Sequence, residues 1–165
     1  MRNPRAFFQP LAIGAPEPLR EIPFKPSRMI HFFDPSNEKM ASKLPELARK
    51  CDILLGNLED AIPADRKEAA REGLIKLAKE VDFGDCALWT RINSLDSPWV
   101  LDDLLRLVGE IGDRLEVIMV PKVEGAWDIH YIDRLLAQLE AKHGLERPIL
   151  VHAILETSLG VTNVE

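Results

Sequence analysis

The sequence predicts an α/β protein of the (β/α)8 barrel class, of which this chain supplies about the first five strands. From Arg28 onward, short apolar runs without strict alternation are separated by longer stretches with helical spacing. That pattern is typical of strands buried on both faces of a parallel sheet. The first run is followed by Asp34-Pro35-Ser36-Asn37 and not by the glycine-rich turn that a dinucleotide-binding sheet needs. A barrel is therefore favoured over an open doubly wound sheet.

The strands and helices alternate along the chain. Strands are expected at residues 29–33, 53–58, 87–93, 117–120 and 149–155, and helical spacing covers residues 40–48, about 65–80, 101–108 and 129–139. Pro45 is expected to kink or split the first helix, because a proline in a helix interior removes a hydrogen bond. Ser97 followed by Pro98 predicts the start of the third helix, with the serine as its N-cap.

The first 26 residues differ in composition from the rest. They hold six of the twelve prolines, and each proline removes a backbone donor and fixes φ. This segment cannot continue a helix or a central strand. We expect two regions: a proline-rich N-terminal arm at residues 1–26 and a partial barrel domain at residues 27–165.

Composition excludes several classes of partner. The 165 residues are 46% hydrophobic, and no uninterrupted apolar run approaches the length of a membrane-spanning helix. The net charge is −6 and the basic residues are dispersed, so neither nucleic acid nor a membrane is an expected partner. The two cysteines, Cys51 and Cys86, lie far apart and outside metal-binding spacing, which predicts reduced thiols in a cytoplasmic protein.

Charged residues stand where the apolar runs end. In a barrel the reactive face is the carboxyl end of the strands, so these residues are the candidates for a site. They are Glu59, Asp60, Arg91, Asn93, Lys122, Glu156 and Thr157. Any one of them could instead cap a helix or form a turn. Together, three carboxylates, an arginine and a lysine suit a hard divalent cation and an anionic substrate.

Four ordered motifs carry a family resemblance. They are Leu58-Glu59-Asp60-Ala61 followed by Lys67-Glu68-Ala69-Ala70-Arg71, Arg91-Ile92-Asn93, Val120-Pro121-Lys122-Val123-Glu124, and Ile154-Leu155-Glu156-Thr157 with Gly160 and Asn163. Over about residues 28–165, the chain resembles the citrate lyase β-subunit and malyl-CoA lyase family of HpcH/HpaI-type aldolases. The malyl-CoA lyase branch looks closest, and only the N-terminal part of that family's barrel is covered.

The resemblance implies a magnesium-dependent carbon–carbon lyase, with manganese as a possible substitute metal. Such an enzyme cleaves a β-hydroxyacyl-CoA of malyl-CoA type into acetyl-CoA or propionyl-CoA and a 2-oxo acid such as glyoxylate, by a retro-Claisen or retro-aldol mechanism. By resemblance, Glu156 is a metal ligand, Arg91 holds the oxo-acid or enolate oxygen, and Glu59 and Asp60 surround the reacting group. Arg28 and Lys43 are suggested as coenzyme A contacts.

Alternatives remain open within and outside the family. A malyl-CoA thioesterase or a citrate lyase β-subunit would use the same residues, and a non-catalytic binding or assembly module would use none of them in chemistry. The family's second metal-ligating aspartate lies beyond Glu165, so the 165-residue chain alone is expected to be inactive, either as a fragment or as a partial barrel. An unfinished barrel exposes a strand edge, which predicts a homo-oligomer.

Overall fold

The computed structural model describes residues 9–22, 24, 25 and 27–164, and it contains one parallel sheet of five strands in the order β1-β2-β3-β4-β5. The strands are β1 (Ile30–Phe33), β2 (Ile53–Asn57), β3 (Ala87–Arg91), β4 (Leu115–Val120) and β5 (Leu150–Ala153). The helices are α1 (Glu38–Ala41), α2 (Leu44–Leu47), the 3-10 turn η2 (Ala64–Arg66), α3 (Lys67–Glu80), α4 (Val100–Ile111), α5 (Ala126–His143) and α6 (Ser158–Thr162). The expected α/β architecture with five parallel strands is confirmed.

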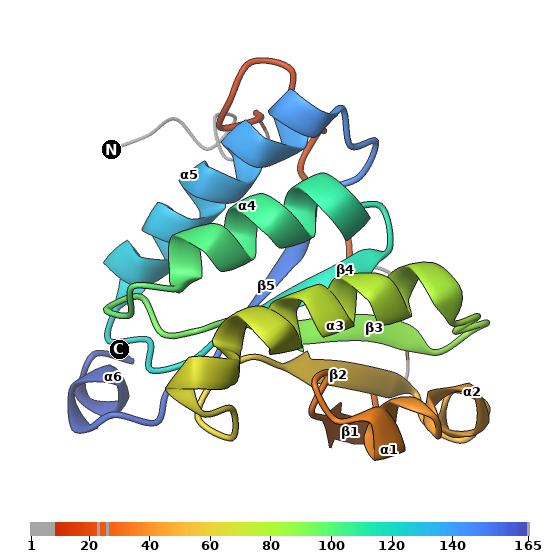
Figure 1. Cartoon of the computed structure of the whole chain (residues 1–165). Coiled ribbons are helices and arrows are strands. Elements are labelled where there is room, and N and C mark those ends of the chain that lie inside the picture. The colour runs from red at the N-terminus through yellow and green to blue at the C-terminus, as the bar shows by residue number, and fades with distance from the viewer. Residues whose placement is uncertain (1–8, 23, 26, 165) are drawn as a thin grey trace.

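One face of the sheet carries the hydrophobic core. Helices α3, α4 and α5 lie side by side over this face, with α1 and α2 next to β1 (Figure 1). Alternate strand residues such as Leu54, Leu88 and Ile118 point into this layer and pack in the core cluster with Leu74 of α3 and Leu104 of α4. Apolar burial between the helices and the sheet therefore fixes the strand register.

The opposite face of the sheet has no helix over it in the described part of the chain. Ile53, Trp89 and Val117 line a hollow there, together with Leu19 and Ile22 of the arm. In a closed barrel this face is the interior, which is why its side chains are apolar, and Ile53 and Val117 are buried here as well.

Most element boundaries agree with the sequence to within three residues. Pro45 splits the first helix as expected, since α1 ends at Ala41 and Pro45 lies in the first turn of α2. The expected fifth strand is too long at both ends. At the carboxyl end its partner β4 ends at Val120 and Pro121 offers no N–H to continue the ladder, and at the amino end the Ile149 N–H donates to the Glu140 carboxylate.

The predicted start of the third helix at Ser97 is wrong. Helix α4 begins at Val100, with Trp99 at the N-cap and no side-chain cap. The Ser97 N–H instead donates to Ser94 O within a turn, and its buried hydroxyl has no hydrogen-bond partner. A serine followed by a proline is compatible with a local turn as well as with a helix start, and the chain adopts a turn here.

The described part of the arm contains neither helix nor strand. It reaches the sheet through Lys25, whose ammonium forms an ion pair with Glu116 of β4 at 2.8 Å. Residues 1–8, 23 and 26 of the predicted arm lie outside the described residues. Among the residues that are described, none of the helices is long and apolar enough to cross a membrane, and both cysteines are free.

Candidate active site at the carboxyl edge of the sheet

The candidate site lies where β2, β3, β4 and β5 end. The strands run parallel, so their carboxyl ends share one edge, and the polar residues beyond them are brought together. Glu59 and Asp60 come after β2, Arg91 ends β3, Lys122 comes after β4, and Glu156 comes after β5. Contacts between these side chains link residues that are up to 63 positions apart in the sequence.

Glu59 is the buried centre of this cluster. Its side chain is only 3% exposed, and its carboxylate lies between two cations. Lys122 Nζ donates to Oε1 at 2.5 Å, and an Arg91 guanidinium nitrogen lies 3.3 Å from Oε2. The Glu59 backbone N–H donates to the Asn57 side chain, which fixes the turn after β2. A buried carboxylate is tolerated only with such compensation.

Asp60 is the exposed partner of Glu59. Lys122 Nζ also donates to its Oδ1 at 2.9 Å, and the side chain remains 67% exposed. The hydrogen bond from Lys122 lowers the pKa of Asp60, and the two carboxylates together raise the pKa of the Lys122 ammonium well above its usual range. Asp60 and Lys122 are therefore both charged at neutral pH.

Arg91 is held in place from two sides. Its Nε donates to Asn57 Oδ1 at 2.8 Å, and its guanidinium stacks over the Phe32 ring at 5.6 Å from the centroid. The side chain is 16% exposed, so part of this planar cation still faces solvent. An arginine fixed in this way is suited to bind a carboxylate or a developing oxyanion.

A second lysine supports the loop after β2. Lys67 begins α3, is buried, and donates from Nζ to the carbonyl oxygens of Leu58 and Glu59 at 2.8 and 3.1 Å. Its ammonium lies 5.3 Å from the Trp99 ring centroid. Burial lowers the pKa of Lys67. This contact ties the backbone beside Glu59 to the first turn of α3.

The segment after Arg91 is anchored by a buried ion pair. Asp103 of α4 is fully buried and accepts from Arg71 Nε of α3 at 2.9 Å. Its other oxygen accepts from the backbone N–H and the side-chain amide of Asn93 at 2.9 and 2.7 Å. Both carboxylate oxygens are thus used, which joins α3, α4 and the end of β3.

Glu156 lies at the same edge but is exposed to solvent. Its Oε1 accepts the backbone N–H of Lys122 at 3.1 Å. Within the described residues there is no group of three or more histidine, cysteine, aspartate or glutamate side chains placed to hold a metal. Mg²⁺ takes oxygen ligands and keeps several waters, so an exposed carboxylate at this edge fits as one ligand of such an ion.

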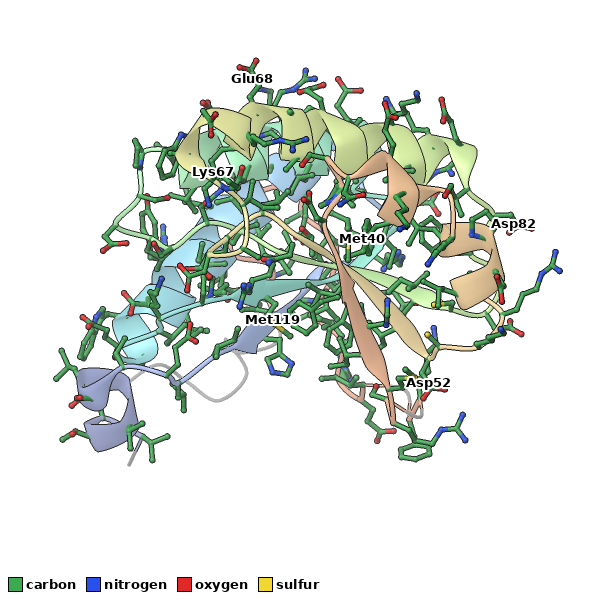
Figure 2. All side chains as sticks on the ribbon, turned by 60° about the horizontal axis from the view of Figure 1, so that its bottom comes forward. Met40, Asp52, Lys67, Glu68, Asp82 and Met119 are labelled. Carbon is green, nitrogen blue, oxygen red and sulfur yellow. The ribbon has the colours of Figure 1, made fainter. Side chains whose placement is uncertain are left out.

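Two of the residues suggested by resemblance lie away from this cluster. Arg28 precedes β1 and forms a two-pronged ion pair with Asp52, at 2.7 and 3.2 Å. Asp52 lies at the end of the sheet away from Lys67, as Figure 2 shows. Lys43 is exposed at the N-cap of α2. The structure does not bring Arg28 to the carboxyl edge, and the coenzyme A contacts stay predictions.

Several residues of the site were missed as functional candidates by the sequence reasoning. Lys122 was named as a strand-end candidate, but its contacts with Glu59 and Asp60 were not predicted. Asn57, Lys67 and Asp103 lie within or beside predicted elements and resemble ordinary strand or helix residues. The spacing of Lys67 and Arg71, one helical turn apart, could have indicated two cations directed at one layer.

A parallel sheet of βα units with polar residues gathered at its carboxyl edge is the arrangement expected for part of a (β/α)8 barrel. A family model described as HpcH/HpaI aldolase/citrate lyase matches residues 28–165. The chain therefore belongs to this family.

The curated relatives point to one branch of the family. A malyl-CoA/β-methylmalyl-CoA/citramalyl-CoA lyase from Chloroflexus aurantiacus is 58% identical over 159 residues, covering 96% of this chain and 46% of the relative. An L-malyl-CoA/β-methylmalyl-CoA lyase from Cereibacter sphaeroides is 34% identical over 143 residues, covering 87% of this chain and 44% of the relative. The chain thus spans less than half the length of the relatives that it matches.

Solved structures confirm the fold. A Haloferax volcanii malate synthase in complex with magnesium and glyoxylate superimposes with a TM-score of 0.69 at 19% identity, covering 79% of this chain and 43% of that one. The citrate lyase β-subunit from Mycobacterium tuberculosis gives a TM-score of 0.59 at 22% identity, covering 81% of this chain and 49% of that one. About half of each of these proteins corresponds to the five strands seen here.

Proposed function

We propose that this chain is the N-terminal part of a magnesium-dependent carbon–carbon lyase that acts on a β-hydroxyacyl-CoA of malyl-CoA type. The observation that carries the proposal is the cluster at the carboxyl edge, in which Glu59, Asp60, Arg91 and Glu156 converge from three strand ends. Identity of 58% to a malyl-CoA/β-methylmalyl-CoA/citramalyl-CoA lyase supports the substrate class. The products are acetyl-CoA or propionyl-CoA and a 2-oxo acid such as glyoxylate.

The reaction breaks one carbon–carbon bond. The β-hydroxyl group loses its proton and becomes the carbonyl of the 2-oxo acid, while the bonding electron pair moves into the thioester as an enolate. A proton then adds to the α-carbon of that enolate and gives the acyl-CoA. Negative charge develops on oxygen atoms during these steps, so the site must supply fixed positive charge.

Arg91 supplies that charge in the proposal. Its guanidinium is permanently charged, planar and held by Asn57 and Phe32, so little reorganisation is needed when the oxyanion develops. Glu59 fixes the guanidinium from the buried side, and Asp60 is the exposed carboxylate beside the reacting group. Glu156 would hold a Mg²⁺ ion, which supplies a Lewis acid for the carbonyl and carboxylate oxygens of the 2-oxo acid.

A chimera tests the proposal without requiring any sequence of this protein beyond residue 165. In this lyase chimera, the present chain replaces the matching segment of the Chloroflexus aurantiacus lyase. We expect the folded chimera, given malyl-CoA and Mg²⁺, to release acetyl-CoA and glyoxylate. Free malate and coenzyme A would indicate a thioesterase, a class also found among the relatives at 30% identity. If a folded chimera released none of these products, that result would contradict an enzymatic role.

A further inference from the structure

The backbone at Lys122 is unusual. Within the described part of the chain, Lys122 is the only residue other than glycine with a positive φ, at 53°. A left-handed conformation is sterically unfavourable for a residue that carries a side chain. Such a conformation persists only where the surroundings fix it, and it is often found at functional sites. It lies here directly after β4, at the carboxyl edge.

This conformation directs two parts of one residue to the carboxylates of two other strands. The Lys122 backbone N–H donates to Glu156 after β5, and Lys122 Nζ donates to Glu59 and Asp60 after β2. Lys122 therefore bridges the two sides of the edge. Arg91 completes the arrangement from β3, on the far side of Glu59.

The ammonium of Lys122 is needed to balance the charge of Glu59. The buried Glu59 Oε2 has no hydrogen-bond partner, although an Arg91 nitrogen lies 3.3 Å away. Without Lys122, the contact with Arg91 would be the one ion pair left to the buried Glu59 carboxylate among the described residues. A buried charge with one poorly aligned partner is strongly disfavoured, so the carboxylate would move.

We propose that Lys122 is a positioning residue of the site: its ammonium holds Glu59 and Asp60 beside Arg91, and its left-handed backbone aims its N–H at Glu156. This inference rests on the proposed function. It predicts that the ammonium contributes to turnover by placing Glu59, which in turn fixes Arg91. It also predicts that the left-handed backbone at Lys122 contributes to the site in spite of its conformational cost.

The first test is a set of substitutions in the lyase chimera. Lys122→Met keeps the length of the side chain and removes its charge, and we expect kcat to fall by about 100-fold with less than a threefold change in KM. Lys122→Arg restores a cation, and its kcat should be at least tenfold higher than that of Lys122→Met. Lys76→Met, at an exposed lysine on α3, is the matched control and should leave both constants unchanged.

The second test measures the backbone and the ion pair without turnover. Lys122→Gly should melt at a higher temperature than Lys122→Ala, because both lose the ammonium and only glycine adopts the left-handed φ freely. In a 15N-lysine NMR spectrum, the Lys122 ammonium should be protected from exchange, and Glu59→Gln should remove that protection. If Lys122→Met fails to fold, kcat is measured for Lys122→Gly in its place, because this variant also lacks the ammonium.

The outcomes separate the two proposals. If the chimera is active and Lys122→Met behaves like Lys76→Met, or if both Lys122→Gly and Lys122→Met keep full kcat, the positioning role is wrong and the proposed function stands. If the folded chimera releases no acetyl-CoA and glyoxylate from malyl-CoA, the proposed function fails and the role of Lys122 in turnover fails with it.

Discussion

At the residue scale, the site is built around one buried carboxylate. Glu59 is compensated by Lys122 and Arg91, and each of these cations has a further partner, Asp60 for the lysine and Asn57 for the arginine. The sequence could predict that Glu59, Asp60, Arg91 and Glu156 share one edge, because strand ends share an edge in parallel sheets. It could not predict the central role of Lys122, because no sequence pattern indicates that a lysine adopts a left-handed backbone conformation.

Glu156→Gln tests the assignment of the metal ligand. Glutamine keeps the shape and can still accept the Lys122 N–H, but it loses the charge that attracts a divalent cation. In the lyase chimera we expect the affinity for Mn²⁺, followed by electron paramagnetic resonance as a substitute for Mg²⁺, to fall by more than about tenfold. The melting temperature should change little. An unaltered Mn²⁺ titration would remove Glu156 from the metal site.

Arg91→Lys tests the role of the guanidinium. A lysine cannot both hydrogen bond to Asn57 and stack on Phe32 while presenting a planar fork. We expect kcat of the chimera to fall by about 100-fold, the usual effect of losing one oxyanion donor. Steady-state kinetics with malyl-CoA measure it. If kcat and KM both stayed within about twofold, a barrier change of under roughly 0.5 kcal/mol, Arg91 would have no such role.

Glu140 is a buried carboxylate outside the site, and it predicts a pH dependence of stability. It accepts the Ile149 N–H at 2.8 Å, and burial raises its pKa. A carboxyl group with a raised pKa in the folded state favours folding at low pH, and this contribution is lost as pH rises through the folded pKa. Glu140→Gln should therefore stabilise the chimera at pH 8, by on the order of 1 kcal/mol, and have a smaller effect at pH 4. Thermal melts at the two pH values measure it, and equal effects at both would contradict the assignment.

At the scale of the elements, the Asp103 network shows how the helices position the site. Asp103 joins α3, α4 and the end of β3 through contacts with Arg71 and Asn93. The apolar stripe of α4 could be predicted from the sequence, but this buried acid interrupts that stripe, and only the fold identifies its partners. The wrong start predicted for α4 has the same origin, because the turn at residues 94–97 is stabilised by contacts within the loop.

Asp103→Asn should destabilise this part of the molecule. The amide has a single acceptor oxygen for the donors of Arg71 and Asn93, and it leaves a buried guanidinium without a counter-charge. We expect a loss of about 3 kcal/mol in the free energy of unfolding. Chemical denaturation of the chimera measures this loss, with Asp102→Asn on the exposed side of α4 as the control. A loss no larger than that of the control would show that the pair contributes little.

At the scale of the whole molecule, five strands form a sheet with one covered face and one open face. Helical spacing and short apolar runs predicted strands covered on both faces, and among the described residues helices cover one face of the five-stranded parallel sheet (Figure 1). The open face carries Phe32, Trp89 and Val117, which are residues of a barrel interior. The predicted homo-oligomer stays a prediction.

The 165-residue chain expressed by itself is expected to associate. The exposed β5 edge and the open apolar face both favour contact with another copy. Analytical ultracentrifugation should show dimers or larger species whose proportion rises with concentration. We also expect no turnover from this chain alone. A monomeric, active 165-residue protein would contradict the barrel interpretation.

The most direct test of the central claim is the formation of a carbon–carbon bond. The lyase chimera, supplied with acetyl-CoA, glyoxylate and Mg²⁺, is expected to form malyl-CoA, as the α-carbon of acetyl-CoA loses a proton and bonds to the aldehyde carbon of glyoxylate. Chromatography with mass detection identifies the product, and the Arg91→Lys and Glu156→Gln variants should form far less of it. A folded chimera that forms no malyl-CoA under conditions where the Chloroflexus lyase does so would contradict the account.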